Sequence, residues 1–96
     1  MYLKHLNIDI LKIDGQFIQD ILEDPLDDVA VRFFIELARV MNLRTVAEFV
    51  DTPEVLDRIK ELGIDYAQGF LLHKPEPIDS AINIATASQL ANTKDK

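Results

Sequence analysis

Three short apolar stretches alternate with three amphipathic stretches along the chain, and this order restricts the fold more than any other feature of the sequence. The apolar stretches cover residues 8–14, 45–50 and 66–72, and their β-branched and aromatic residues favour strands. The amphipathic stretches that follow them have the length and spacing of helices. Strands separated by such helices form right-handed crossovers in a parallel sheet. We therefore predict the α/β fold class, with three βα units.

The first helix is predicted to begin at Asp24 and Pro25, because an aspartate suits the cap position and a proline suits the first turn. Its apolar residues recur every three or four positions, which predicts one buried stripe of Leu26, Val29, Phe33, Leu37 and Val40. We also expect Phe34 and Met41 in the core. These residues would hold the helix against the sheet.

Two further helices carry signals of the same kind. Thr52 and Pro53 predict the start of the second helix and Gly63 predicts its end. Its expected inner stripe consists of Val55, Ile59 and Leu62. The third helix is predicted from near Pro77 to about Leu90, with an inner face of Ile78, Ala81, Ile82 and Ala85.

The composition excludes several classes of function. With 17 acidic and 10 basic residues the formal net charge is −7, which disfavours binding to DNA or RNA. The chain has no cysteine, hence no disulfide framework and no thiolate metal site. No apolar run reaches the roughly 18 residues that a membrane helix needs. We expect a cytoplasmic protein with no membrane segment in this chain.

The length suits a single domain, which we predict at residues 1–92, followed by a polar tail at 93–96. The sequence contains no glycine-rich phosphate loop and no pair of histidines at metal-binding spacing. His5 and His73 are isolated, and we expect them on the surface or in an interface.

Polar side chains stand at or near the end of each predicted strand. Lys12 and Asp14 end the first strand, Glu48 and Asp51 the second, and Gln68 lies in the third. The carboxyl ends of parallel strands, together with the loops after them, are where α/β proteins build their sites. One lysine, several carboxylates and an amide at one rim would suit a divalent metal ion and a phosphate group.

Each of these residues also has a simpler structural explanation. Lys12 and Asp14 suit a solvated strand end or an ion pair, and Glu48 suits a structural pair with a lysine or arginine. Gln68 suits a packed amide at a strand kink, and Asp51 suits a helix start. Their joint placement at three successive strand ends favours a site, because chance would scatter them.

Three segments of the sequence resemble a known family. They are "YLKHLNIDILKIDGQFIQDI", "LRTVAEFVDTPE" and "LGIDYAQGFLLHKPEP", and with helix-sized gaps they cover about residues 2–78. In this order they resemble the last third of an EAL domain, the bacterial signalling phosphodiesterase that hydrolyses cyclic di-GMP. The combination is specific, whereas any one of the segments alone is weak.

The resemblance implies a modified (β/α)8 TIM-like barrel, of which this chain supplies about strands six to eight and therefore an incomplete barrel. It implies that Lys12 acts on the attacking water or the phosphate, that Glu48 belongs to the metal and water site, and that Gln68 lines the nucleotide site. Asp14 would support local structure. The implied cofactor is Mg²⁺ or Mn²⁺, and the implied ligand is cyclic di-GMP.

The sequence also departs from the family pattern. The EAL signature and the paired aspartates are missing, so we predict that the chain alone has no phosphodiesterase activity. "AEFVD" replaces the family's AEGVE, with Phe49 in place of glycine and Asp51 in place of the second glutamate. The alternative function is a non-catalytic module that senses cyclic di-GMP or self-associates through open sheet edges.

Overall fold

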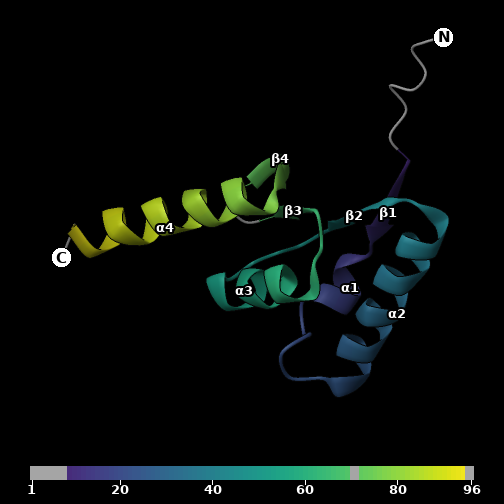
Figure 1. Ribbon diagram of the computed structural model, residues 1–96. Coiled ribbons are helices and arrows are strands. Elements are labelled where there is room, and N and C mark those ends of the chain that lie inside the picture. The colour runs from purple at the N-terminus through teal and green to yellow at the C-terminus, as the bar shows by residue number, and fades with distance from the viewer. Residues whose placement is uncertain (1–8, 70–71, 95–96) are drawn as a thin grey trace, which may run out of the picture.

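The computed structural model describes residues 9–69 and 72–94, which form one sheet and four helices (Figure 1). In chain order the elements are β1 (Ile10–Ile13), α1 (Gly15–Ile18), α2 (Pro25–Met41), β2 (Arg44–Ala47), α3 (Pro53–Leu62), β3 (Tyr66–Gly69), β4 (Leu72–Pro77) and α4 (Ile78–Lys94).

The sheet has the strand order β1-β2-β3-β4, and its first three strands are parallel. Lys12 of β1 lies opposite Val46 of β2, and Ala47 of β2 lies opposite Ala67 of β3. Helices α2 and α3 make the two crossovers between these strands. The predicted α/β class and the parallel order of the three strands are confirmed.

Strand β4 was not predicted. The third strand was expected to run through residue 72, with a helix from near Pro77 as the next element, but β3 ends at Gly69 and β4 returns antiparallel to it. Leu72 lies opposite Gly69, and Pro77 lies opposite Tyr66. Pro75 and Pro77 in "LHKPEP" are unusual in a strand, because a proline has no N–H to donate to a neighbouring strand. They are tolerated here because β4 is an edge strand, so one side of its backbone needs no partner in the sheet.

The predicted start signals of α2 and α3 form as expected. The carboxylate of Asp24 accepts a hydrogen bond of 2.9 Å from the backbone N–H of Leu26. The hydroxyl of Thr52 accepts one of 3.2 Å from the N–H of Val55. Each cap satisfies an N–H that has no partner within its own helix.

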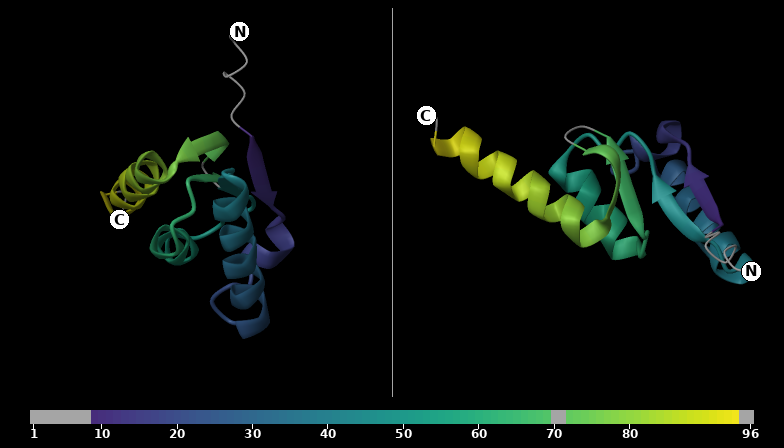
Figure 2. Two further views of the ribbon diagram at one scale, coloured as in Figure 1. Left: turned by 45° about the vertical axis from the view of Figure 1, so that its right-hand side comes forward. Right: turned by 90° about the horizontal axis from the view of Figure 1, so that it is seen from above.

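Helix α4 begins at Ile78, next to the expected Pro77, and continues to Lys94. It is therefore longer than the helix that the sequence predicted, which ended at about Leu90. Figures 1 and 2 show that its C-terminal half projects away from the sheet. Residues 95–96 of the predicted polar tail lie outside the described residues.

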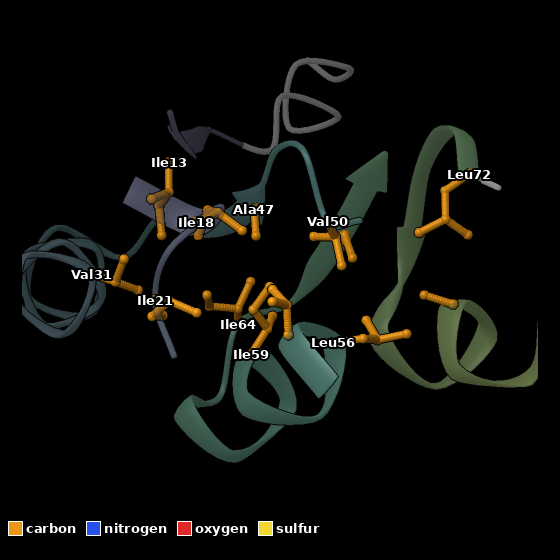
Figure 3. Packing of buried hydrophobic residues seen from close by; sticks show 13 residues of the cluster. Ile13, Ile18, Ile21, Val31, Ala47, Val50, Leu56, Ile59, Ile64 and Leu72 are labelled. Atoms are coloured by element: carbon orange, nitrogen blue, oxygen red, sulfur yellow. The ribbon is translucent and has the colours of Figure 1, made fainter. Parts of the chain in front are cut away.

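The core lies between the sheet and the helices, as Figure 3 shows at close range. From the sheet it takes Ile13, Ala47 and Ala67, which are at most 1% exposed. The expected inner faces of α3 and α4 are confirmed, with Val55, Ile59 and Ala81 buried and Leu62, Ile78, Ile82 and Ala85 packed against them. These contacts fix the three parallel strands relative to their helices.

The predicted buried stripe of α2 was wrong. All five of its members are exposed, including Phe33 at 61% and Val40 at 68%, and Met41 is exposed as well. The helix has a second apolar face with the same spacing, and it is this face that meets the core, through Val31, Phe34, Ile35 and Ala38. Periodicity alone could not choose between two faces that both recur at helical intervals.

Candidate active site at the carboxyl ends of the parallel strands

The residues predicted for the site share one face of the sheet. Successive side chains of a strand point to opposite faces, and Ile13, Ala47 and Ala67 point into the core. Lys12 and Glu48 therefore lie on the face away from that core. Gln68, directly after Ala67, lies on the same face. This face of the parallel strands is the one that does not carry the core.

Glu48 and Gln68 come together at one level of the sheet. They directly follow Ala47 and Ala67, which are opposite one another in β2 and β3. Both side chains are half-buried and line a hollow of about 550 Å³; in the part of the chain that the structure describes, Phe49, Gly69 and Leu72 line it as well. The structure thus brings together two of the predicted site residues.

Lys12 does not line this hollow. It lies opposite Val46, two positions before Glu48, and its side chain is exposed. Its ammonium group is therefore accessible from the same face of the sheet. Four carbon atoms separate this group from the backbone, so it can reach toward a ligand held above the strand ends.

The loop that carries Glu48 is held on both sides by backbone hydrogen bonds. The N–H of Glu48 donates to the carbonyl oxygen of Ile13 at 3.2 Å, and the N–H of Val50 donates to that of Gln68 at 3.0 Å. The ladder of the sheet thus continues past the end of β2. Glu48 consequently projects from a supported backbone rather than from a free loop.

Phe49 has an unusual backbone conformation. Its φ is 60°, in the left-handed region that bulky residues rarely adopt. The sequence marked this position, because Phe49 stands where the resembling family has glycine, the residue that adopts such angles without strain. Its role in lining the hollow was not predicted, nor was that of Leu72.

Asp14 and Asp51 do not line the hollow. The carboxylate of Asp14 accepts a hydrogen bond of 2.9 Å from the N–H of Gln16 and caps α1. Asp51 is exposed and directly precedes Thr52, the cap of α3. Both residues therefore lie at helix starts in this chain.

The alternative explanation for Glu48 was a structural ion pair. Among residues 9–69, 72 and 74–88, whose side chains the structure describes, no lysine or arginine forms an ion pair with its carboxylate. Glu48 thus lines the hollow, and no basic side chain from this part of the chain pairs with its carboxylate. A carboxylate in that position can accept hydrogen bonds or bind a cation.

The donor set does not fit a complete metal site. In the part of the chain that the structure describes, no three carboxylate or imidazole side chains gather closely enough to hold a metal ion. Glu48 offers one carboxylate, whereas Mg²⁺ is held in octahedral geometry by several oxygen ligands. Any metal ion bound here would need most of its ligands from elsewhere.

The described helices give no membrane span either, since none of them is long and apolar enough to cross a bilayer. His73 lies on β4, and His5 lies outside the described residues.

Comparison with known proteins shows which protein family the sequence of this chain matches. The model of the EAL domain family matches residues 1–75 of the chain. The match includes β1, β2 and β3 and every residue that the sequence predicted for the site. It corresponds to the C-terminal part of the EAL domains in the relatives.

Two relatives are named as cyclic di-GMP phosphodiesterases. PdeA of Borreliella burgdorferi is 51% identical over 77 residues, which is 80% of this chain and 12% of the relative. PdeF of Escherichia coli is 43% identical over 81 residues, which is 84% of this chain and 11% of the relative. The chain thus spans only a small part of the length of either relative.

A solved structure shows the same arrangement of elements. The PaMucR phosphodiesterase in complex with c-di-GMP is 39% identical and superposes with a TM-score of 0.65, over 83% of this chain and 32% of that one. Such structural neighbours are TIM barrels, and the sheet of this chain corresponds to part of the barrel.

Proposed function

The chain belongs to the EAL domain family, and from this premise we propose that its strand ends form part of a site that binds cyclic di-GMP and hydrolyses one of its phosphodiester bonds. The observation that carries the proposal is the convergence of Glu48 and Gln68 on one hollow, with Lys12 exposed on the same face of the sheet. This is the edge at which α/β barrels carry their chemistry.

Hydrolysis requires a water oxygen to attack phosphorus while the bond from phosphorus to one ribose oxygen breaks. Negative charge builds up on the phosphoryl oxygens in the transition state. In our proposal the ammonium group of Lys12 stabilises that charge, because a fixed positive group there gains more from the transition state than from the ground state. The product is the linear dinucleotide.

Glu48 and Gln68 have different roles in this proposal. Carboxylate oxygens bind hard divalent cations, so Glu48 would supply one ligand to Mg²⁺ or Mn²⁺, with the other ligands coming from outside the described residues. Such an ion would supply positive charge and a more acidic water. The amide of Gln68 can both donate and accept hydrogen bonds, which suits contact with the nucleotide.

The chain alone should bind cyclic di-GMP without hydrolysing it, because Glu48 is a single carboxylate. Calorimetry with cyclic di-GMP and Mg²⁺ measures binding, and chromatography of the nucleotide after incubation measures hydrolysis. Formation of the linear dinucleotide by the purified 96-residue chain would contradict the predicted lack of activity. If calorimetry detects no binding, the proposal that the chain binds cyclic di-GMP is wrong.

A chimeric enzyme tests the catalytic roles. The 77-residue segment of Borreliella burgdorferi PdeA that aligns with this chain is replaced by the corresponding residues of this chain. Lys12→Met and Glu48→Gln should each lower kcat/KM by about 100-fold or more, with the fold intact by circular dichroism. Lys60→Met is the matched control, because Lys60 lies on α3, away from the hollow, in an exposed pair with Asp79.

Full activity of the Lys12→Met chimera would remove this lysine from the reaction. A folded chimera that hydrolyses nothing, beside an active PdeA, would favour the second candidate function. That candidate is a non-catalytic sensor of cyclic di-GMP, and the observation that favours it is Phe49, a bulky residue beside Glu48 with a φ of 60°. If the chain is a sensor, both the 96-residue chain and the chimera should bind cyclic di-GMP, and neither should hydrolyse it.

Self-association is a separate proposal. Among the described residues β1 pairs with β2 on one side only, which leaves its other edge available for a second strand. We expect the isolated chain to form dimers or larger species by light scattering, and a monomer at high concentration would contradict this. We further propose a cytoplasmic protein that does not bind DNA or RNA, in keeping with its acidic composition.

A further inference from the structure

Phe49 keeps a strained backbone conformation next to the proposed site. A phenylalanine at a φ of 60° costs about 1–2 kcal/mol relative to ordinary angles. The residues on either side cannot release this strain, since the N–H groups of Glu48 and Val50 are bonded to β1 and β3. The fold therefore holds the backbone of Phe49 in this conformation, which sets the direction in which its side chain leaves the loop.

The ring of Phe49 lies against the backbone of Gly15, at the start of α1. A β-carbon at residue 15 would overlap the ring atoms, so only a glycine leaves room for this contact. The Phe49 residue is nevertheless 54% exposed and lines the hollow together with Glu48 and Gln68. One side of the ring is thus supported by protein while the residue remains open to a ligand.

A supported aromatic ring beside a polar amide matches the chemistry of a nucleobase. A base offers a flat π-face for stacking and a polar edge for hydrogen bonds. The hollow of about 550 Å³ falls within the range of small-molecule sites. We propose that Phe49 binds the ligand by stacking on a purine base, while the amide of Gln68 faces the polar groups of the same nucleotide. The assignment of that base as guanine rests on the proposed function.

The first test compares affinities in the 96-residue chain and in the chimera. Phe49→Leu keeps an apolar side chain and a similarly strained backbone but removes the aromatic face. It should weaken binding of cyclic di-GMP by about 5- to 100-fold, the range expected for loss of one stacking contact. The matched control is Phe33→Leu, because Phe33 is also exposed, at 61%, but lies on α2 outside the hollow. It should leave the affinity unchanged.

The second test uses fluorescence, because the chain contains no tryptophan. Phe49→Trp introduces a single indole whose emission should be quenched when a guanine stacks on it. Phe33→Trp places the same fluorophore on α2, where cyclic di-GMP should leave the emission unchanged. Far-UV circular dichroism of both variants checks that they fold.

The outcomes separate this inference from the proposed function. If the wild-type proteins bind cyclic di-GMP while Phe49→Leu binds equally well and Phe49→Trp is not quenched, then Phe49 only covers Gly15. The stacking role is then overturned and the proposed function stands. If neither the chain nor the chimera binds cyclic di-GMP, both are overturned. Weakened binding together with quenching at position 49 alone supports the stacking role.

Discussion

The carboxylate of Asp28 on α2 accepts two hydrogen bonds from the guanidinium group of Arg58 on α3, 2.8 Å from Nε and 3.0 Å from Nη2. Arg32 donates a third, 2.9 Å long, to the same carboxylate. The side chains of Asp28 and Arg58 are only 17% and 29% exposed, so water screens this pair less than the other ion pairs of the described residues. It joins two helices that flank β2 in the chain.

Asp28→Asn should lower the free energy of unfolding at neutral pH by about 1–2 kcal/mol, because it removes the charge from bonds that the guanidinium group strengthens. Urea unfolding measures the loss. Glu36→Gln is the control, since its pair with Arg39 lies on an exposed surface of α2 and its loss should be undetectable. Equal destabilisation by both substitutions would contradict a special role for Asp28.

The same pair makes stability depend on pH. The hydrogen bonds from Arg58 lower the pKa of Asp28 below its ordinary value of 3.8, against the opposing effect of burial. A carboxyl group whose pKa is lower in the folded state than in the unfolded state stabilises the fold at a pH above its unfolded-state pKa. This stabilisation is lost as the pH falls through the lowered folded-state pKa. The difference in the free energy of unfolding between the wild type and Asp28→Asn should therefore become smaller below pH 3.8. A gap that stays constant during acid titration would exclude this ionisation as its source.

Thr45→Val should destabilise the fold by about 1–3 kcal/mol, although the two side chains have nearly the same shape. The buried hydroxyl of Thr45 donates to the carboxylate of Asp65 at 3.2 Å and accepts a bond of 3.1 Å from the N–H of Asp65. Valine would leave that N–H without its partner. Thr86→Val on the exposed part of α4 is a suitable control for thermal unfolding, and equal melting temperatures of the two variants would refute the prediction.

Two identical substitutions on α2 test which of its faces is buried. Val31→Ala should cost about 1–3 kcal/mol, because Val31 is 0% exposed and the deletion leaves a cavity. Val40→Ala removes the same atoms from a residue that is 68% exposed and should change stability by less than about 0.5 kcal/mol. Chemical denaturation of the 96-residue chain decides the matter. If Val40→Ala destabilises the chain more than Val31→Ala does, the face of α2 that the periodicity predicted is the buried one.

Gly69→Ala should be severely destabilising, by about 3 kcal/mol or more. A β-carbon at Gly69 would lie 2.5 Å from the backbone nitrogen and 2.8 Å from the carbonyl oxygen of Val50, at a φ of 144°. Gly63→Ala is matched to it, because its φ of 86° is also left-handed but its β-carbon would meet nothing within 4 Å. Its cost should stay near 1 kcal/mol. Similar losses, measured by urea unfolding, would mean that the approach of Val50 does not matter.

The local features of the fold were predictable because their causes lie within a few residues. The caps at Asp24 and Thr52 need only the next turn of the chain, and the strands need only a short apolar run. The edge strand β4 was missed because its pairing with β3 depends on a turn and on partners that composition does not reveal. Pro75 and Pro77 made the strand harder to recognise, because proline is rare within strands.

For the candidate site, the sequence by itself determined which side chains stand at or near the strand ends, namely Lys12, Glu48 and Gln68. The succession of strands and helices along the chain follows from local patterns, and so does the alternation of side chains within each strand. Only the tertiary structure decided that Glu48 and Gln68 share a hollow, that the ring of Phe49 rests on Gly15, and which apolar face of α2 is buried. The physical reason is that these outcomes depend on register and close packing between segments distant in the chain, where several apolar surfaces compete for one core.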